Sequence, residues 1–226
     1  MPRATLTDLE MERMRRRLAQ GALELYAAQG TEAVSFRDLA LHLGISHTLP
    51  YRYFDNKDAL FAQVRGGCFR DMLELMRAAD PRGEPAPARL YALGYSIVDY
   101  VKAHPAQYRL MFSLQQPPLE LYPELLQARR EAFGYLVKVV EDGVREGSLQ
   151  GDALTVIHLC WVSVHGLLTL HAAGQLVHGR GLDELMPPLL DAVIGRHLRQ
   201  PAADQSPAPA AIPQARAGSR RDGGKP

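Results

Sequence analysis

The chain has 226 residues, of which 46% are hydrophobic and 23% are charged, proportions that indicate an ordinary soluble protein with ample core. Its 26 Lys and Arg residues nearly balance its 25 Asp and Glu residues, which gives a formal net charge of +1. This balance excludes a generally basic protein that coats nucleic acid, so any contact with DNA must come from a local patch.

The N-terminal segment has no apolar core of a signal peptide. The two cysteines, Cys68 and Cys160, lie far apart in the sequence, which is typical of a reducing compartment, with a redox pair as the less favoured alternative. We therefore predict a cytoplasmic protein.

The first predicted helix begins at a capping box formed by Thr7 and Glu10. Apolar residues then recur every three or four positions as far as Ala28, which predicts one apolar face, and Gly30 ends the helix. The arginines within 13–17 lie mostly off that face. We interpret them as a solvated surface, with contact to DNA phosphates as the alternative.

The stretch 35–57 has the pattern of a helix-turn-helix. Ser35 and Asp38 form a second capping pattern, and Gly44 follows the last apolar turn, where a residue able to take a positive φ ends a helix. Ser46 then stands where a new N-cap is needed. This spacing predicts a short helix, a tight turn, and a second helix from His47 to about Phe54.

The second of these helices is dense in aromatic and polar side chains. With Phe54 turned to the core, Tyr51, Arg52 and Tyr53 would spread toward phosphates or base edges. An ordinary packed helical hairpin is the alternative that the pattern alone leaves open.

The run Gly44–Leu60, G-I-S-H-T-L-P-Y-R-Y-F-D-N-K-D-A-L, resembles the N-terminal DNA-binding domain of the tetracycline-repressor (TetR) family, and the resemblance extends back to Ser35 and the preceding helix. One departure is Pro50, where the family usually has a branched aliphatic residue. Because Pro50 would fall at the end of the first helical turn, we expect a slightly tightened helix start and not a broken helix.

The resemblance implies a set of residues that contact DNA. His47, Thr48, Tyr51 and Arg52 are the expected contacts to bases or the groove, while Ser35, Arg37, Tyr53 and Lys57 would hold phosphates. Ser46, which would cap the reading helix, belongs to the same DNA-binding set. Lys57 also opens the next helix, where the helix N-terminus and a cation both attract anions.

A helix over 57–80 is expected to connect this unit to the rest of the chain, and the turn residues of 80–87 mark a boundary. In TetR-like proteins this helix links the ligand site to the DNA mechanically. Residues 88–199 then read as helices with short breaks and no alternating strand pattern, so the fold class is all-α. Residues 200–226 are rich in Pro, Ala and Gly, and predict a disordered tail.

The segment 152–174 is the most apolar in the chain, and no Asp, Glu, Lys or Arg lies between Asp152 and Arg180. A membrane span is one interpretation of its length, but its three histidines and its hydroxyl side chains argue against that. A buried helix or a subunit interface is favoured. The resemblance implies that this helix and 182–198 form a four-helix dimer interface with their partners.

The sequence Trp161-Val-Ser-Val-His165-Gly166 resembles the Trp-x-x-x-His-Gly signature of one C-terminal subclass of these regulators. His158, Trp161 and His165 share a helix face, which can line a ligand pocket or pack within a core. A metal site from His158, His165 and His171 is less favoured. The predicted pocket residues are Tyr95, Tyr108, Met111, Phe112, Trp161 and His165.

The sequence contains no catalytic constellation, so we expect no enzyme and no cofactor. The resulting hypothesis has four regions: a three-helix DNA-binding domain (1–56), a connecting helix (57–80), a helical bundle for ligand binding and dimerisation (88–199), and the tail (200–226). It describes a homodimeric repressor that binds a palindromic operator in double-stranded DNA, with no membrane contact, and that a small, largely apolar effector releases.

Two other classes remain as alternatives. A DNA-binding protein that needs no ligand would have a packed C-terminal domain without a cavity. A protein-interaction module that has kept the fold but lost DNA binding would tolerate Tyr51→Ala and Arg52→Ala.

Overall fold

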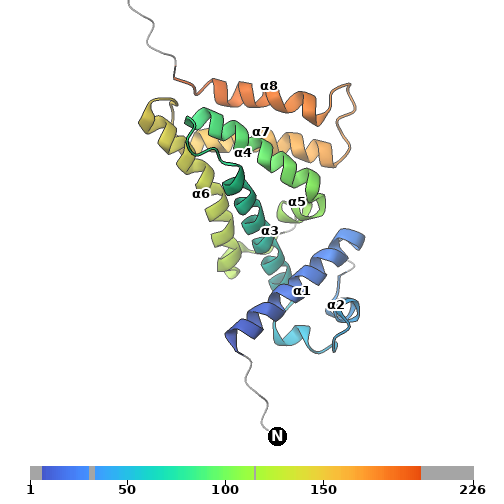
Figure 1. The fold of residues 1–226 in the computed structure, drawn as a ribbon. Helices are drawn as coiled ribbons and strands as arrows, with labels where there is room; N and C mark the ends of the chain where they lie inside the picture. The colour runs from blue at the N-terminus through green and yellow to red at the C-terminus, as the bar shows by residue number, and fades with distance from the viewer. Residues whose placement is uncertain (1–6, 31–33, 115, 200–226) are drawn as a thin grey trace, which may run out of the picture.

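The structure is a computed structural model that describes residues 7–30, 34–114 and 116–199. The predicted disordered tail and the first six residues lie outside this range. The described residues form eight α-helices and two short 3₁₀ segments, with no strand, which confirms the all-α fold class (Figure 1). The helices are α1 (Asp8–Gln29), α2 (Phe36–Leu43), α3 (Lys57–Ala79), α4 (Ala86–Ala103), α5 (Pro105–Met111), α6 (Pro123–Glu146), α7 (Ala153–Ala172) and α8 (Leu182–Gly195), and the 3₁₀ segments are Pro50–Arg52 and Leu119–Leu121.

The helices α1 and α2 begin at the capping residues that the sequence predicts, and α3 begins at a further side-chain cap. Thr7 with Glu10, and Ser35 with Asp38, form complete capping boxes at α1 and α2, which satisfy amides that have no partner within the helix. The amide of Ala59 donates to the side chain of Asn56 at 2.8 Å at the start of α3. Local side-chain chemistry therefore sets these boundaries.

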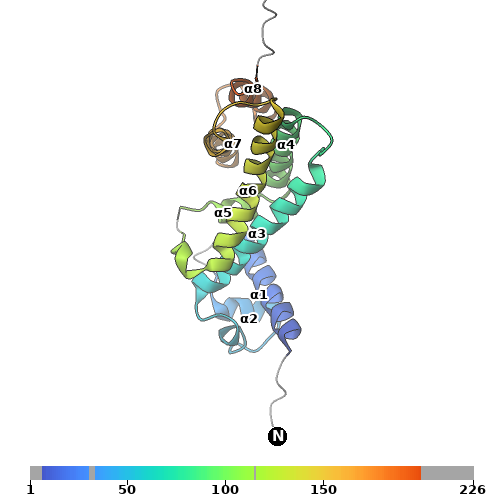
Figure 2. The same cartoon turned by 90° about the vertical axis from the view of Figure 1, so that its left-hand side faces the viewer.

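The molecule has an N-terminal head and a C-terminal body joined by one helix. Figures 1 and 2 show α1 and α2 at one end, α4 to α8 at the other, and α3 running from the head into the body. Buried apolar side chains form a single continuous cluster along this path, from Leu18 and Leu39 in the head through Phe61 and Met76 on α3 to Leu168 in α7. No solvated gap therefore separates the head from the body.

The prediction of a regular helix from His47 to about Phe54 is wrong. Residues 47–49 form a turn, and only Pro50–Arg52 is helical, with 3₁₀ geometry. The amides of Arg52 and Tyr53 donate to carbonyls three residues earlier, each at 3.0 Å. Pro50 explains the difference, because it has no amide to donate four residues back, and in a regular α-helix its ring would clash with the carbonyl of Ser46.

A buried carboxylate joins three helices where α3 ends. The side chain of Asp80 is fully buried and accepts two hydrogen bonds from the guanidinium of Arg89, at 2.9 and 2.8 Å. It accepts a third from the hydroxyl of Tyr135 on α6 at 2.6 Å. The hydrogen bonds from Arg89 are the main reason that the pKa of Asp80 is lowered. This cluster fixes the end of α3 against α4 and α6.

Candidate functional site

The surface formed by residues 46–57 carries most of the predicted DNA contacts. Tyr51 is 64% exposed, and its ring meets the ring of Phe36 edge to face with centroids 4.7 Å apart. Arg52, His47 and Thr48 are also exposed, whereas Phe54 is buried as predicted. The segment therefore presents a polar and aromatic surface to solvent above an apolar anchor.

Contacts from α1 hold this surface in place. The Arg17 guanidinium donates to the carbonyl of Leu43 at 3.1 Å, at the end of α2. Gly44 takes a left-handed conformation with φ of 62°, which reverses the chain at a conformation that favours glycine. The Arg15 guanidinium lies 5.6 Å from the centroid of the Phe54 ring. Two arginines of the run 13–17 therefore stabilise the turn, a role that their sequence pattern did not predict.

Two predicted DNA contacts have a different environment from the one expected. Tyr53 is only 6% exposed and belongs to the core, so we remove it from the set that contacts phosphates. Ser46 caps no helix, since its hydroxyl lies 3.0 Å from the hydroxyl of Thr48 inside the turn. The other predicted contacts are at least partly exposed: Ser35, Arg37, His47, Thr48, Tyr51, Arg52 and Lys57.

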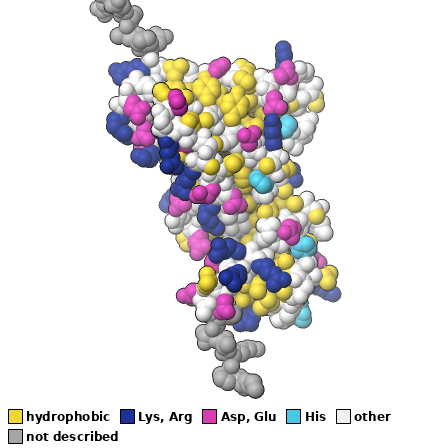
Figure 3. Space-filling view, viewed as in Figure 1, with side chains coloured by type: hydrophobic (Ala, Val, Ile, Leu, Met, Phe, Trp, Pro, Cys, Tyr) yellow, Lys and Arg dark blue, Asp and Glu magenta, His cyan; other side chains and the backbone are white. Residues whose placement is uncertain are grey.

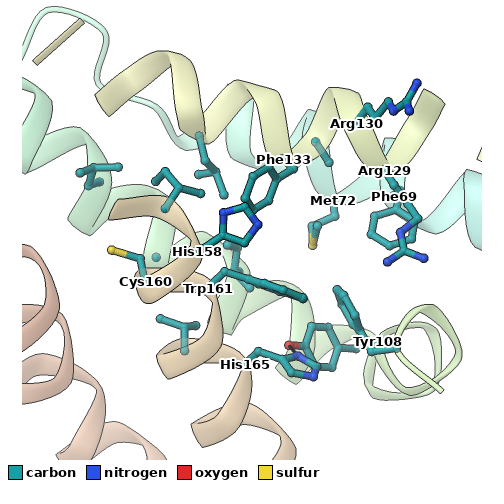
Figure 4. A pocket seen from close by; sticks show the side chains of 18 of the residues that line it. Phe69, Met72, Tyr108, Arg129, Arg130, Phe133, His158, Cys160, Trp161 and His165 are labelled. Carbon is teal, nitrogen blue, oxygen red and sulfur yellow. Dashed lines mark hydrogen bonds between the residues drawn. The ribbon is translucent and has the colours of Figure 1, made fainter. Parts of the chain in front are cut away.

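The body contains a cavity of about 360 Å³ between α3 and the helices α4 to α8. This volume lies within the range of small-molecule sites. Phe69 and Met72 from α3 form part of its wall, and Phe133 from α6 and Trp161 from α7 form other parts (Figure 4). The helix that carries the head is therefore also a wall of the cavity.

The structure brings together four of the six predicted pocket residues. The hydroxyl of Tyr108 lies 2.6 Å from Nδ1 of His165, and the ring centroids of Phe112 and Trp161 lie 4.7 and 5.8 Å from that of His165. Burial lowers the pKa of His165, which favours the neutral imidazole at neutral pH. All four side chains line the cavity.

Tyr95 and Met111 lie outside the cavity and are corrections to the predicted pocket. Tyr95 is 41% exposed, and Met111 is fully buried in the core. Both lie on helices that line the cavity, but neither is a lining residue. Helical periodicity shows which residues share one face of a helix. It does not show which face lines a cavity between helices.

Several lining residues were not predicted from the sequence, among them Phe69, Arg129 and Phe133. Phe69 lies within the expected apolar helix of 57–80 and has an ordinary core pattern. Arg129 has the pattern of a surface charge. No signal in the sequence distinguishes these residues, because helices distant in the chain form the space between them.

The alternative of a metal site finds no support in the described part of the chain, where no group of three His, Cys, Asp or Glu side chains gathers. The two cysteines are free thiols. Burial raises the pKa of Cys68 to about 12 and that of Cys160 to about 11. Neither thiol is therefore set up as a reactive nucleophile.

A buried cation connects α3 with the helix that carries Tyr108. Arg65 is 4% exposed and donates to the carbonyl of Leu110 at 3.0 Å and to the hydroxyl of Ser113 at 3.3 Å. Both acceptors lie at the C-terminal end of α5, where unpaired carbonyls attract cations. This polar contact joins the C-terminal end of α5 to α3.

The helix α7 leaves one apolar face uncovered. Leu159, Val162 and Leu170 are 41%, 60% and 48% exposed, and with Gly166 they follow the spacing of a single helix face. By length and composition α7 is the one described helix that could cross a bilayer, and 28% of its most apolar window is buried. Figure 3 shows hydrophobic side chains gathered over the α8 end of the body, and Lys and Arg side chains over α1.

Two family models match the chain. The model described as "Bacterial regulatory proteins, tetR family" matches residues 18–64. The model described as "Tetracyclin repressor-like, C-terminal domain" matches residues 90–193. Together they cover most of the head, the start of α3, and most of the body.

The chain is also similar to solved structures. A protein of unknown function from Rhodococcus sp. RHA1 has a TM-score of 0.73 and 25% identity, covering 88% of this chain and all of that chain. The fatty acid degradation regulator FadR from Bacillus halodurans has a TM-score of 0.67 and 15% identity, covering 81% and 96%. The TetR family transcriptional regulator PfmR from Thermus thermophilus has a TM-score of 0.61 and 17% identity, covering 81% and 100%. No curated protein sequence matches the chain.

Proposed function

Because this chain belongs to the TetR family of DNA-binding transcription regulators, whose members are not enzymes, we propose that it is a homodimeric repressor that a small apolar effector releases from a palindromic operator. The observation that carries this proposal is the double role of α3, which packs in the core of the head and forms a wall of the cavity. One helix thus has contact with both predicted sites.

The exposed surface of the head supports operator reading by Tyr51 and Arg52, with His47 and Thr48 beside them. Arginine offers a bidentate fork to guanine, and hydroxyl groups can meet either phosphates or bases. The 3₁₀ segment of Pro50–Arg52 is short, so we propose that the turn at 47–49 contributes contacts that a longer helix would otherwise supply. Ser35, Arg37 and Lys57 are the proposed phosphate contacts.

The uncovered face of α7 supports dimerisation. A stripe of apolar side chains on a soluble protein marks an interface, and α8 packs beside α7 as the second helix of the proposed four-helix contact (Figure 2). A symmetric pair of heads would enter major grooves about 34 Å apart, one helical turn of DNA. A two-fold dimer in turn requires a palindromic operator.

The cavity supports release by a ligand. An effector among Tyr108, Phe112, Trp161 and His165 would shift α3 and change the separation of the two heads. It must bind the released state better than the DNA-bound state, since a ligand shifts an equilibrium only by its differential affinity. The place of Trp161 and His165 in the cavity wall also supports the proposed membership of the Trp-x-x-x-His-Gly subclass.

The proposal is tested by selecting retained sequences from a pool of random duplex DNA with the purified protein. We expect a palindrome whose binding weakens with rising salt and with Arg52→Ala. Trp161→Ala should keep DNA binding and lose release by an effector found with that operator. Selection of no sequence at low salt, or unchanged release in Trp161→Ala, would contradict the proposal.

Two other functions make different predictions. A regulator that needs no ligand would have a packed body, whereas the described residues line a cavity of about 360 Å³. An interaction module that does not bind DNA would tolerate Tyr51→Ala and Arg52→Ala, and the same DNA selection separates that function from the one proposed.

A further inference from the structure

The charged side chains that line the cavity are all cations. Of the lining residues only Arg129 and Arg130 carry a full charge, and no Asp or Glu of the described chain is among them. The remaining wall is apolar or aromatic, apart from neutral polar groups. The cavity therefore has a positive charge and no negative charge to balance it.

Arg129 differs from the other arginines that lie inside the body. Arg65 donates to the end of α5, and Arg89 pairs with Asp80. Arg129 has no hydrogen bond and no ion pair within the described residues, and its guanidinium instead lies 5.6 Å from the centroid of the Phe69 ring. Burial is the one cause that lowers its pKa. A partly buried cation without an anion is costly, because desolvation is not offset.

Three neutral polar side chains of the cavity wall have partners within the chain. Tyr108 and His165 are hydrogen-bonded to each other, and Nδ1 of His158 meets the carbonyl of Leu154 at 2.7 Å. Arg129 differs from them because it is a partly buried cation of the wall whose guanidinium makes no hydrogen bond within the described residues.

Figure 4 shows the Arg129 guanidinium beside Phe69, while the side chain of Arg130 points away from the labelled rings. Of these two adjacent arginines, Arg129 is directed toward the aromatic wall and Arg130 is exposed. A guanidinium offers two parallel N–H donors, which match the two oxygens of a carboxylate.

We propose that the effector is an apolar monocarboxylate whose carboxylate pairs with Arg129 and whose body lies against Phe133, Trp161 and Phe112. This inference rests on the proposed function and names the chemical class of its ligand. A cavity of 360 Å³ holds about a dozen non-hydrogen atoms at the ~30 Å³ that one water molecule occupies. The anion would lie where α6 meets α3, next to the helix that carries the head.

The test compares 4-butylbenzoate with its neutral isostere 4-butylbenzamide by titration calorimetry on the full-length protein at pH 7.5. We expect the benzoate to bind at least about tenfold more tightly, as a charge-assisted hydrogen bond provides. Arg129→Gln should remove this difference and leave the affinity for the amide unchanged. Arg109→Gln, at an exposed position of α5 that does not line the cavity, is the control, and it should change either affinity by less than about threefold, as expected for an exposed charge.

Equal affinity of the wild-type protein for the benzoate and the amide would overturn the proposal, and this comparison needs no variant that folds. Equal loss of both affinities in Arg129→Gln would also overturn it, because the residue would then be structural. Binding of the amide alone would refute the anionic ligand while the cavity remained a ligand site. Binding of neither compound would refute both the anionic ligand and the use of the cavity as a ligand site. Binding of the benzoate without operator release would refute the proposed release mechanism alone.

Discussion

The head and the body of this protein are both helical, but different kinds of interaction define them. Interactions between residues close in sequence set the boundaries of the head, such as the capping box of Ser35 and Asp38 and the left-handed Gly44. Interactions between distant residues define the body. Asp80 pairs with Tyr135 across 55 positions, and Tyr108 with His165 across 57.

The difference shows which parts of a binding protein depend on packing. A surface that reads DNA needs side chains displayed at fixed local spacing, and a short segment can encode that display. A cavity is a volume that packed helices fail to fill, so every lining residue depends on helices elsewhere in the chain. We therefore expect substitutions in the body to act mainly through stability and those on the head surface through DNA affinity.

The largest expected effect is that of Asp80→Asn, which leaves the partly buried Arg89 beside a neutral amide. We predict a loss of about 3 kcal/mol in the free energy of unfolding, as for a broken buried ion pair, measured by urea denaturation. The matched control is Asp183→Asn, which breaks the exposed pair with Lys102 at 2.6 Å and should cost less than about 1 kcal/mol. Equal costs for the two variants would contradict the role given to Asp80.

The same pair makes stability depend on pH in a direction that can be checked. Because the pKa of Asp80 is lowered in the folded protein, its stabilisation is complete above the ordinary aspartate pKa of about 4 and is lost as the pH falls through the lowered value. The difference in unfolding free energy between wild type and Asp80→Asn should therefore shrink below about pH 4. A constant difference down to pH 3 would count against this linkage.

Arg52→Ala should act on the other region and leave stability almost unchanged. The loss of one arginine contact to a base is expected to weaken operator binding by about 1–3 kcal/mol, measured by fluorescence anisotropy with the selected operator. Arg180→Ala, at an exposed position before α8, is the control and should bind DNA normally. A melting temperature lowered in parallel with affinity would mean that Arg52 supports the fold and does not read DNA.

Two glycine substitutions compare packing in the two regions directly. A Cβ on Gly143 would lie 2.5 Å from the Cβ of Ala86, which cannot rotate away, whereas a Cβ on Gly21 would lie 2.9 Å from the flexible end of Leu43. Alanine gains about 1 kcal/mol in helix propensity over glycine, and overpacking costs about 1–3 kcal/mol. We predict that Gly143→Ala lowers the unfolding free energy by about 1–2 kcal/mol and that Gly21→Ala stays near zero. Thermal denaturation of both variants tests this order.

The smallest expected effect is that of Pro50→Ala. The new amide can donate to the carbonyl of Ser46, but the unfolded chain gains freedom when proline is removed, so stability should change by less than about 1 kcal/mol. Hydrogen exchange at residues 50–52 should slow as the 3₁₀ segment becomes an α-helical turn. Unchanged exchange would show that the tertiary contacts of Phe54, and not Pro50, impose the 3₁₀ geometry.

The sequence predicted the all-α fold and the capping residues of the head, since both follow from periodicity and local chemistry. It did not predict the 3₁₀ geometry of Pro50–Arg52, because the expected first turn assumed that Ser46 would cap a helix. The sequence also did not predict that Tyr53 is buried while its neighbour Arg52 is exposed. The phosphate contact of Tyr53 was predicted from its position on a regular α-helix, and the backbone at 50–52 has 3₁₀ geometry instead.

The pocket was predicted in part for the same physical reason. Trp161 and His165 share one face of one helix, and their spacing is visible in the sequence. Arg129 and Phe69 enter the same wall from α6 and α3, and their approach depends on the packing of helices that the sequence analysis could not place. Tyr95 and Met111 were also predicted to line the pocket, but their side chains lie on faces directed elsewhere.

Because α3 is long, a small tilt of this helix at the cavity would become a larger displacement at the head. Met72 in the cavity wall lies 15 residues from Lys57 at the head end of the same helix, a distance of about 22 Å at 1.5 Å per residue. A tilt of about 5° around the cavity would therefore carry the head end through about 2 Å over that same length. In a symmetric pair the two displacements add, and the separation of two DNA-reading surfaces would change by about the rise of one base pair.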